Sequence, residues 1–318
     1  MSTILLIGGS GQISRELARV LPALGTLYIA DRMQCDLRRP QTLIDAVDVV
    51  RPTVVINAAA YTAVDKAEDE PVLATAVNAG APGVLAHAAR RHGALFVHYS
   101  TDYVFDGRKH GAYSEGDPVN PLSTYGRTKL AGERAVRDAG GDHLIVRTSW
   151  IYAPHGKNFL LTMLRLAKER EQLRVVVDQV GAPTAARLVA EATVQVLRQD
   201  IARRRLGCFE SGLLHLTASG KTSWYGFATA LIAAAQTESP PFKCREIVPI
   251  TTAEYPLPAQ RPANSVLDCA RLAQRYGMRM PSWDIGMELC LEELHKGTID
   301  RTSVLSRLPR VTQRMAHG

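Results

Sequence analysis

Cysteine is scarce and scattered in this sequence of 318 residues. The cysteines are odd in number, never stand in CxxC spacing, and are Cys35, Cys208, Cys244, Cys269 and Cys290. This usage argues for reduced thiols in a cytoplasmic protein and against a zinc site built from cysteine.

Long hydrophobic runs are also missing. The chain is 46% hydrophobic and 22% charged, and we find no apolar run that approaches the roughly 20 residues of a membrane helix. The N-terminal segment MSTILLIGG has no basic leader and runs directly into an apolar strand, which argues against a signal peptide. We therefore expect a soluble globular protein, not bound to a membrane, with one large or two ordinary domains.

A dispersed basic surface is absent as well, although the net charge is +7. Within 296–318, five basic residues stand against one acidic residue, which places a net charge of +4 in this short segment. The remaining excess is spread over 295 residues. We expect a flexible basic tail at 296–318 and no nucleic-acid partner.

Apolar runs alternate with helical patterns through the first half of the chain. The predicted strands are rich in Val, Ile and Leu without strict alternation, and they span 3–8, 26–31, 53–60, 94–101 and 143–150. Such strands, joined by helices, indicate a parallel sheet that is covered on both faces. Right-handed crossovers then predict an α/β fold with a Rossmann-like, doubly wound sheet.

The rhythm changes from about residue 150, where proline and arginine become more frequent. We predict that 1–150, together with roughly 172–202, forms a dinucleotide-binding domain. The segments 151–171 and roughly 203–295 then form a smaller C-terminal α/β substrate domain. The cleft between the two is expected at the carboxyl ends of the strands.

The segment IGGSGQIS joins the first strand to the first helix. Gly8 and Gly11 fit a glycine-rich turn whose backbone approaches a diphosphate held by the helix N-terminus. Asp31 ends the second strand 20 residues beyond Gly11, where a carboxylate meets an adenine ribose hydroxyl. Arg32 is placed to receive a 2′-phosphate instead, so the sequence predicts a dinucleotide cofactor and leaves NADH and NADPH open.

A polar constellation follows the fourth strand. The segment HYSTDYVFDG places Ser100 and Thr101 at the cleft edge, where open α/β sheets bind ligands. Tyr125 and Lys129 come about 24 residues after Thr101, on the next predicted helix, and residues four apart share one helix face. A hydroxyl residue followed by Tyr-x-x-x-Lys resembles the extended short-chain dehydrogenase/reductase superfamily.

Six segments narrow this resemblance to the dTDP-4-dehydrorhamnose reductase family, in the family's order: NAAAYTAVDKAE, HYSTDYVFDG, YGRTKLAGE, RTSWIYAPHGKNF, DQVGAPT and RPANSVLD. They cover the chain to about residue 295. The resemblance implies NADPH- or NADH-dependent reduction of the C4 ketone of dTDP-4-dehydro-6-deoxy-L-mannose to dTDP-L-rhamnose, for cell-surface polysaccharide. It also implies a homodimer, and it makes the smaller domain the one that binds the sugar nucleotide.

The resemblance implies a role for each residue of the constellation. Tyr125 is the expected general acid, and its phenol has an unperturbed pKa of about 10. A Lys129 ammonium below the ring is expected to lower that pKa and to hydrogen-bond the nicotinamide ribose. Thr101 is expected to donate to the ketone oxygen as that oxygen gains charge.

The remaining expected contacts follow from the same resemblance. The cofactor is expected beside Gly8, Gly11, Gln12, Ile13, Asp31, Arg32, Asp36, Leu37, Ala60, Tyr61, Thr62, Tyr99, Tyr125 and Lys129. The sugar is expected beside Thr101, Asp102 and Trp150, and the substrate diphosphate beside Arg261, because a guanidinium binds phosphate as a fork.

Some family members carry a magnesium ion between subunits, held by glutamates. The positions that match loosely are Glu16, Glu191 and Glu293. Three glutamates on three helices are ordinarily solvated, and the sequence favours that interpretation over a Mg²⁺ site.

Three rival functions stay in view. Nucleotide-sugar dehydratases follow the threonine with an Asp-Glu pair, whereas here Tyr103 follows Thr101 and Asp102, which disfavours dehydration. The regulatory beta subunit of methionine adenosyltransferase resembles the same reductases, so a non-catalytic dinucleotide-binding subunit stays an alternative. A ketoreductase for another dTDP-deoxysugar is the third.

Overall fold

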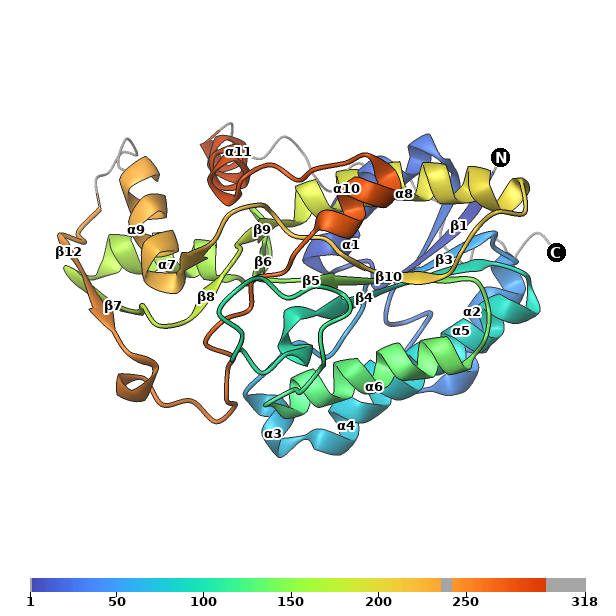
Figure 1. The fold of residues 1–318 in the computed structure, drawn as a ribbon, viewed down its shortest axis with the longest axis horizontal. Coiled ribbons are helices and arrows are strands. Elements are labelled where there is room, and N and C mark those ends of the chain that lie inside the picture. The colour runs from blue at the N-terminus through green and yellow to red at the C-terminus, as the bar shows by residue number, and fades with distance from the viewer. Residues whose placement is uncertain (1, 236–241, 296–318) are drawn as a thin grey trace.

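A central parallel sheet organises the computed structural model, which describes residues 2–235 and 242–295. Its six strands lie in the order β10-β5-β4-β3-β1-β2 (Figure 1). Every pairing between neighbours in this sheet is parallel. This arrangement confirms the predicted α/β fold with a Rossmann-like, doubly wound sheet. The predicted basic tail, 296–318, lies outside the described residues.

The elements follow one another with mostly short connections. The first half contains β1 (Ser2–Ile7), α1 (Gln12–Val20), η1 (Leu21–Ala23), β2 (Gly25–Ala30), α2 (Pro40–Val50), β3 (Val54–Asn57), α3 (Lys66–Asp69), α4 (Pro71–Thr75), the π-helical η2 (Ala76–Gly80), α5 (Ala81–Arg91), β4 (Leu95–Thr101), η3 (Asp102–Val104), α6 (Thr124–Asp138) and β5 (His143–Thr148). The second half contains β6 (Ile151–Tyr152), α7 (Phe159–Glu169), β7 (Gln172–Val176), β8 (Val180–Gly181), β9 (Thr184–Ala185), α8 (Ala186–Arg205), β10 (Gly212–His215), β11 (Thr222–Ser223), α9 (Trp224–Ala235), β12 (Glu246–Ile250), η4 (Thr252–Glu254), α10 (Ala270–Tyr276) and α11 (Trp283–His295).

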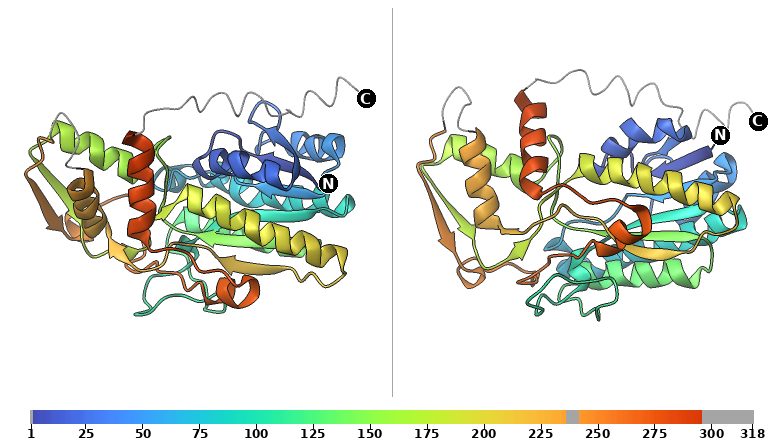
Figure 2. Two further views of the ribbon diagram at one scale, coloured as in Figure 1. Left: turned by 90° about the horizontal axis from the view of Figure 1, so that it is seen from above. Right: turned by 45° about the horizontal axis from the view of Figure 1, so that its top comes forward.

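Both faces of the sheet are buried, as the strand composition predicts. Successive side chains of a strand point to opposite faces, and β1 shows the result directly. Ile4 and Leu6 belong to one core cluster, and Leu5 and Ile7 belong to another. Helices α2, α5 and α6 cover one face, and α1 and α8 cover the other (Figures 1 and 2). The carboxyl ends of β1, β3, β4 and β5 therefore open at one edge, where a ligand can bind.

A smaller region lies beyond β5, at the left of Figure 1, where β7 pairs with β12 and packs against α7 and α9. Two strands, β7 and β10, do not pair within the domain to which the predicted boundaries assign them. β7 opens the range 172–202, which the sequence analysis assigns to the dinucleotide-binding domain, whereas it pairs only within the smaller region. β10 falls within 203–295 but joins the edge of the main sheet beside β5.

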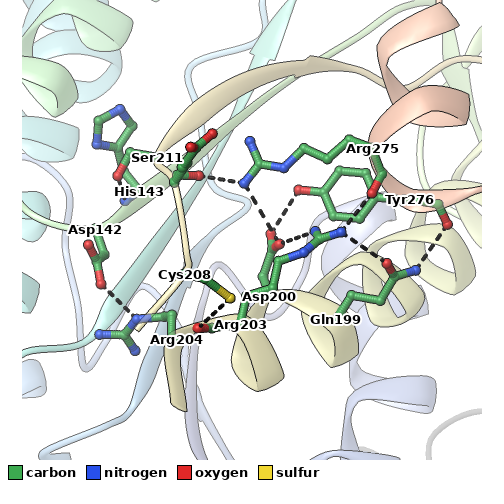
Figure 3. Close-up of polar contacts among 11 residues, drawn as sticks. Asp142, His143, Gln199, Asp200, Arg203, Arg204, Cys208, Ser211, Arg275 and Tyr276 are labelled. Atoms are coloured by element: carbon green, nitrogen blue, oxygen red, sulfur yellow. Dashed lines mark hydrogen bonds and ion pairs between the residues drawn. The ribbon is translucent and has the colours of Figure 1, made fainter. Parts of the chain in front are cut away.

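A polar network at the C-terminal end of α8 fixes this edge of the sheet (Figure 3). The buried Asp200 carboxylate accepts hydrogen bonds from Arg203 Nη1 at 3.0 Å and from the Tyr276 hydroxyl at 2.9 Å. The next arginine, Arg204, donates from Nε to Asp142 at 2.8 Å. The network links α8 to α10 and to the turn before β5, so the segments around β10 are held against the main sheet.

Within the described ranges, one helix is long and apolar enough to cross a membrane by length and composition alone. It is Pro71–Arg91, formed by α4, η2 and α5, with a mean hydropathy of 1.3. The expectation that no apolar run reaches this length is therefore wrong by this measure. The fold buries 44% of the apolar window, and α5 packs against α2 and α6. A core helix passes the same test, so the finding is weak evidence for a membrane.

Two glycines let α6 sit unusually close to its neighbours. A Cβ on Gly126 would overlap the Tyr103 carbonyl oxygen, and a Cβ on Gly132 would overlap the Asn78 carbonyl oxygen. From the same helix, the buried Glu133 carboxylate accepts hydrogen bonds from Arg147 Nε at 2.8 Å and Arg147 Nη2 at 2.7 Å. The position of α6 against the sheet is thus fixed by steric contact and by charge.

We predict that Gly132→Ala lowers the free energy of unfolding by about 1–3 kcal/mol, because the new methyl group meets backbone that cannot move aside. Gly80→Ala is the matched control on the neighbouring helix, where an added Cβ meets nothing within 4 Å. It should raise the stability by about 0.5–1 kcal/mol. Urea unfolding of both variants measures the difference, and equal effects of the two substitutions would contradict this account of the packing.

Candidate active site

A cavity of about 900 Å³ lies at the carboxyl ends of β1, β3, β4 and β5. It brings together most of the residues that the sequence analysis singles out. Those lining it are Gly8, Gly11, Gln12, Ile13, Arg32, Asp36, Leu37, Ala60, Tyr61, Thr62, Tyr99, Thr101, Asp102, Tyr125, Lys129 and Trp150. Residues up to 142 positions apart in the chain therefore share one site, while their individual roles stay predictions.

The glycine-rich turn has a shape that suits a dinucleotide. Gly8 has φ +99°, and a Cβ there would lie 2.7 Å from the Cβ of Ala59. Gly11 is the N-cap of α1 and has no side chain to occupy the first-turn amides. A helix N-terminus with accessible amides binds phosphate oxygens, so this end of the cavity fits a diphosphate.

Asp31, which directly follows β2, does not face the cavity as the sequence predicts. The Asp31 carboxylate accepts hydrogen bonds from the backbone N–H groups of Met33 at 2.9 Å and Gln34 at 3.3 Å, and it lies outside the cavity lining. Asp31 therefore closes its own turn instead of facing the cavity. Arg32, the next residue, does line the cavity.

A second carboxylate nearby is held by an arginine that the sequence analysis missed. Arg38 lines the cavity and forms a fork on Asp36, with Nη2 2.6 Å from Oδ2 and Nε 3.0 Å from Oδ1. The hydrogen bond from Arg38 is the largest cause that lowers the pKa of Asp36 to about 2. The run of basic residues after Asp36 in the sequence was the available signal.

Tyr125 stands in the first turn of α6, which Ser123 caps by accepting a hydrogen bond from the Gly126 N–H at 3.1 Å. Its ring meets that of Tyr103 edge to face, with centroids 5.9 Å apart. Burial raises the pKa of Tyr125 to about 12, and a hydrogen bond with Thr101 acts in the opposite direction. The predicted lowering of this pKa is thus reversed here, because burial outweighs the nearby polar groups.

Thr101 ends β4 and already has polar partners. Its hydroxyl donates to Asp102 Oδ1 at 2.9 Å and accepts from the Tyr103 N–H at 3.2 Å. Burial raises the pKa of Asp102 to about 7, although hydrogen bonds from Ser265 and Thr101 act to lower it. A carboxyl group that is partly protonated near neutral pH therefore lies beside the predicted oxyanion donor.

Lys129 lies one helical turn after Tyr125 and is only 2% exposed. Its Nζ donates to the backbone carbonyl of Tyr99 at 2.6 Å and lies 3.3 Å from Nε2 of His98. Burial lowers the pKa of Lys129 to about 8, while the charge of Glu133 acts to raise it. An ammonium group with this pKa gives up its proton far more readily than an exposed lysine.

Trp150 forms a wall of the cavity and has an unusual backbone. Its φ is +47°, and its ring stacks on Trp224 with centroids 3.5 Å apart and an interplanar angle of 3°. A Cβ on Gly181 would lie 2.5 Å from the Trp150 ring, so the indole is packed directly on that backbone. Trp224 lines a second cavity, and the stacked pair stands between the two.

The second cavity has a volume of about 840 Å³ and mixes apolar and basic side chains. Phe159, Met163 and Leu166 are among its apolar lining residues. Arg261 lines this cavity, and its guanidinium pairs with Asp65 through contacts of 3.0 and 2.8 Å. Arg261 also forms a side-chain hydrogen bond with Tyr103, and the Tyr103 ring contacts that of Tyr125. Arg261 therefore lines the second cavity from a position one side chain away from Tyr125.

The three glutamates proposed for a metal are brought into one network. Arg19 lies 3.1 Å from Glu16 and 3.8 Å from Glu293, and Arg187 contacts both Glu293 and Glu191, at 2.9 and 2.8 Å. Because Glu16 is buried, the alternative of three solvated glutamates is wrong for that residue. Within 2–235 and 242–295, no group of three His, Cys, Asp or Glu side chains is suited to hold a metal ion. Guanidinium groups already neutralise these carboxylates, so within one chain they do not fit a magnesium site.

Comparison with known proteins agrees with this geometry. Residues 1–296 match the RmlD substrate binding domain family. A dTDP-4-dehydrorhamnose reductase from Burkholderia thailandensis is 51% identical over 92% of this chain and 98% of its own length. The enzyme of that name from Escherichia coli K12 is 43% identical over 93% of this chain and 99% of its own.

The chain belongs to the dTDP-4-dehydrorhamnose reductase family.

This membership confirms the resemblance drawn from the six segments. Among solved structures, the dTDP-4-dehydrorhamnose reductase of Bacillus anthracis in complex with NADP has a TM-score of 0.83 and is 34% identical, covering 92% of this chain and 99% of its own. A UDP-glucose 4-epimerase from Thermus thermophilus with NAD has a TM-score of 0.74 and 20% identity, covering 93% and 99%. The latter likeness concerns the fold alone.

For this member of the dTDP-4-dehydrorhamnose reductase family, we predict that Asp102→Asn stabilises the fold at pH 8 and has little effect at pH 4. The pKa of Asp102 is raised from 3.8 to about 7, so its favourable contribution is complete below pH 3.8 and is lost as the pH rises through 7. The shift corresponds to about 4 kcal/mol at most.

Urea unfolding at the two pH values measures this difference. Asp106→Asn serves as a control in the same loop, because hydrogen bonds, the largest from the Arg108 N–H, lower the pKa of Asp106. That substitution should destabilise the protein at pH 8. An equal gain from Asp102→Asn at both pH values would contradict the raised pKa.

Proposed function

We propose that the protein reduces the C4 ketone of dTDP-4-dehydro-6-deoxy-L-mannose to dTDP-L-rhamnose, for use in cell-surface polysaccharide. One observation carries the proposal: Thr101, Tyr125 and Lys129 line the same cavity as the glycine-rich turn of Gly8 and Gly11. Family membership supplies the substrate class, because relatives that match nearly the whole chain are named for this sugar. We therefore assign the function to the cavity that holds both the glycine-rich turn and Tyr125.

Hydride addition puts negative charge on the ketone oxygen, so the site must stabilise this charge and then protonate the oxygen. When bound, a reduced nicotinamide supplies the hydride that C4 receives. Tyr125 gives its phenolic proton to the ketone oxygen, and Thr101 donates a hydrogen bond to that oxygen by turning its hydroxyl away from Asp102. Lys129 stands one turn along the same helix and restores the Tyr125 proton.

The sugar nucleotide has room in the two cavities on either side of the tryptophan pair. We assign the sugar to the first cavity, beside Asp102 and Trp150. We assign the thymidine to the second cavity, where Phe159 and Met163 offer apolar surface. Arg261, at the second cavity, is then placed to exchange its Asp65 partner for the substrate diphosphate, as a fork donor suits both.

NADPH is the cofactor that the site favours. Asp31 Oδ1 accepts from two backbone N–H groups of its own turn, and Asp31 stands outside the cavity lining, so this carboxylate is poorly placed to accept from a ribose 2′-hydroxyl. The exposed side of the turn carries Arg32 at the cavity wall. A guanidinium there suits the 2′-phosphate that distinguishes NADPH from NADH.

We also propose a homodimer in the cytoplasm. The resemblance to the family supports the dimer, and the scattered cysteines support the compartment. Sedimentation of the purified protein tests the dimer directly.

We predict that Tyr125→Phe lowers kcat by roughly 10²–10⁴-fold, because the ring remains while the transferred proton is lost. The assay follows oxidation of reduced nicotinamide with dTDP-4-dehydro-6-deoxy-L-mannose. Fluorescence titration with NADPH should give the same affinity for both proteins. If the wild-type protein binds NADPH but does not oxidise it when any dTDP-sugar is added, the regulatory-subunit alternative takes precedence.

We predict that Arg32→Ala raises the KM for NADPH by about tenfold, the effect of losing roughly 1.4 kcal/mol of phosphate binding, and leaves the KM for NADH unchanged. Arg39→Ala is the matched control, since Arg39 is exposed, lies in the same segment and stands outside the cavity lining. Equal loss with both cofactors would show that Arg32 does not read the 2′-phosphate.

A further inference from the structure

His98 lies directly behind the lysine of the site and takes no part in the roles assigned so far. It is fully buried on β4, where its ring stacks on Phe96 with centroids 6.2 Å apart. Its two nitrogens face different partners: Nδ1 lies 3.3 Å from Asn57 Nδ2, and Nε2 lies 3.3 Å from Lys129 Nζ. A buried imidazole thus connects the end of β3 with the lysine on α6.

The hydrogen-bond network fixes which nitrogen of His98 carries the proton. The backbone N–H of Ala59 points at Asn57 Oδ1 at 3.2 Å, and an N–H can only donate. The Asn57 oxygen is therefore turned toward Ala59, and its NH₂ group is turned toward His98. An amide NH₂ also only donates, so Nδ1 of His98 accepts. A neutral imidazole with an accepting Nδ1 carries its proton on Nε2.

The Nε2–H group of His98 consequently points at Lys129 Nζ. A neutral amine has a lone pair to accept this hydrogen bond, and it still donates to the Tyr99 carbonyl at 2.6 Å. An ammonium group has no lone pair, so it cannot accept from the Nε2–H, and two donors would then face each other. We infer that His98, oriented by Asn57, is a positioning residue that disfavours the ammonium form of Lys129 and thereby eases the return of a proton to Tyr125.

The inference rests on the proposed function and completes its proton balance. Hydride adds to C4, and the ketone oxygen takes the phenolic proton of Tyr125. The Lys129 ammonium then passes one proton to the Tyr125 phenolate, which leaves a neutral amine and a neutral phenol. The amine accepts the hydrogen bond from His98 and regains its proton from solvent. No further reactant is required.

Other charged groups face Lys129, and they act in both directions. Glu133, one turn further along α6, favours the ammonium, but Arg147 on β5 holds that carboxylate in a fork. On the cavity side, the charge of Asp102 acts to raise the pKa of Tyr125. Burial lowers the pKa of Lys129 to about 8 and keeps the pKa of His98 well below its usual value, so the imidazole is neutral.

The first test reads the tautomer of His98 without any turnover. In ¹⁵N NMR spectra of the full-length protein, the two ring nitrogens differ strongly in chemical shift according to which carries the proton. We expect the proton on Nε2 and a lone pair on Nδ1, with the signal assigned by its loss in His98→Gln. A proton on Nδ1 would overturn the inference, whatever the enzymatic activity proves to be.

The second test reverses the network with Asn57→Asp. A carboxylate accepts from both the Ala59 N–H and His98 Nδ1, which forces the proton off Nε2 and lets Nε2 accept from the ammonium. We expect the pKa of Lys129, followed by NMR of its Cε and Nζ, to rise by at least one unit, which is tenfold in the proton equilibrium. The basic limb of the kcat profile should move to higher pH by the same amount.

A control separates the tautomer from the added charge. In the His98→Leu background, Asn57→Asp retains its charge but cannot act through an imidazole, so the shift in the Lys129 pKa should shrink. An unchanged Lys129 pKa in Asn57→Asp alone, or an equal shift in the presence and absence of His98, would overturn the inference.

Discussion

The placement of α6 against β4 and β5 is the constraint on which the rest of the site depends. One carboxylate joins all three elements, because Glu133 accepts from Arg147 at 2.8 and 2.7 Å and from the Ser100 hydroxyl at 2.6 Å. Ser100 precedes Thr101, and Glu133 lies on the helix that carries Tyr125. A buried ion pair adds little net stability relative to apolar packing, yet breaking it is costly. Its consequence here is a fixed placement of Tyr125 relative to Thr101.

Much of the fold follows from the sequence because parallel strands and glycine-rich turns have strong local signatures. The five predicted strands of the first half and the Gly8 turn are present in the structure. Strand β10 has only four residues, and it owes its place to pairing with β5 and to the Asp200 network. Such a strand is fixed by tertiary contacts that local composition does not reveal.

The site shows the same division between what is local and what is not. Spacing alone brings Tyr125 and Lys129 to one helix face, and a strand end brings Thr101 to the cavity. The orientation of Asp31 depends on backbone donors within its own turn, and the hydrogen-bonding neighbours of His98 come from two other elements, β3 and α6. Residue type predicts that a group can react, whereas its protonation depends on partners that only the folded chain supplies.

Trp150 shows how a strained residue can serve selectivity. A positive φ in a bulky residue is unfavourable and persists only where surrounding packing enforces it. Gly181 and Trp224 provide that packing, so neither the backbone nor the ring has freedom to adapt. If the sugar binds beside Trp150 as proposed, a ring substituent that projects toward the indole meets a surface that cannot move aside. The stereochemistry of the sugar would then be selected by steric exclusion against a rigid ring, without a hydrogen bond.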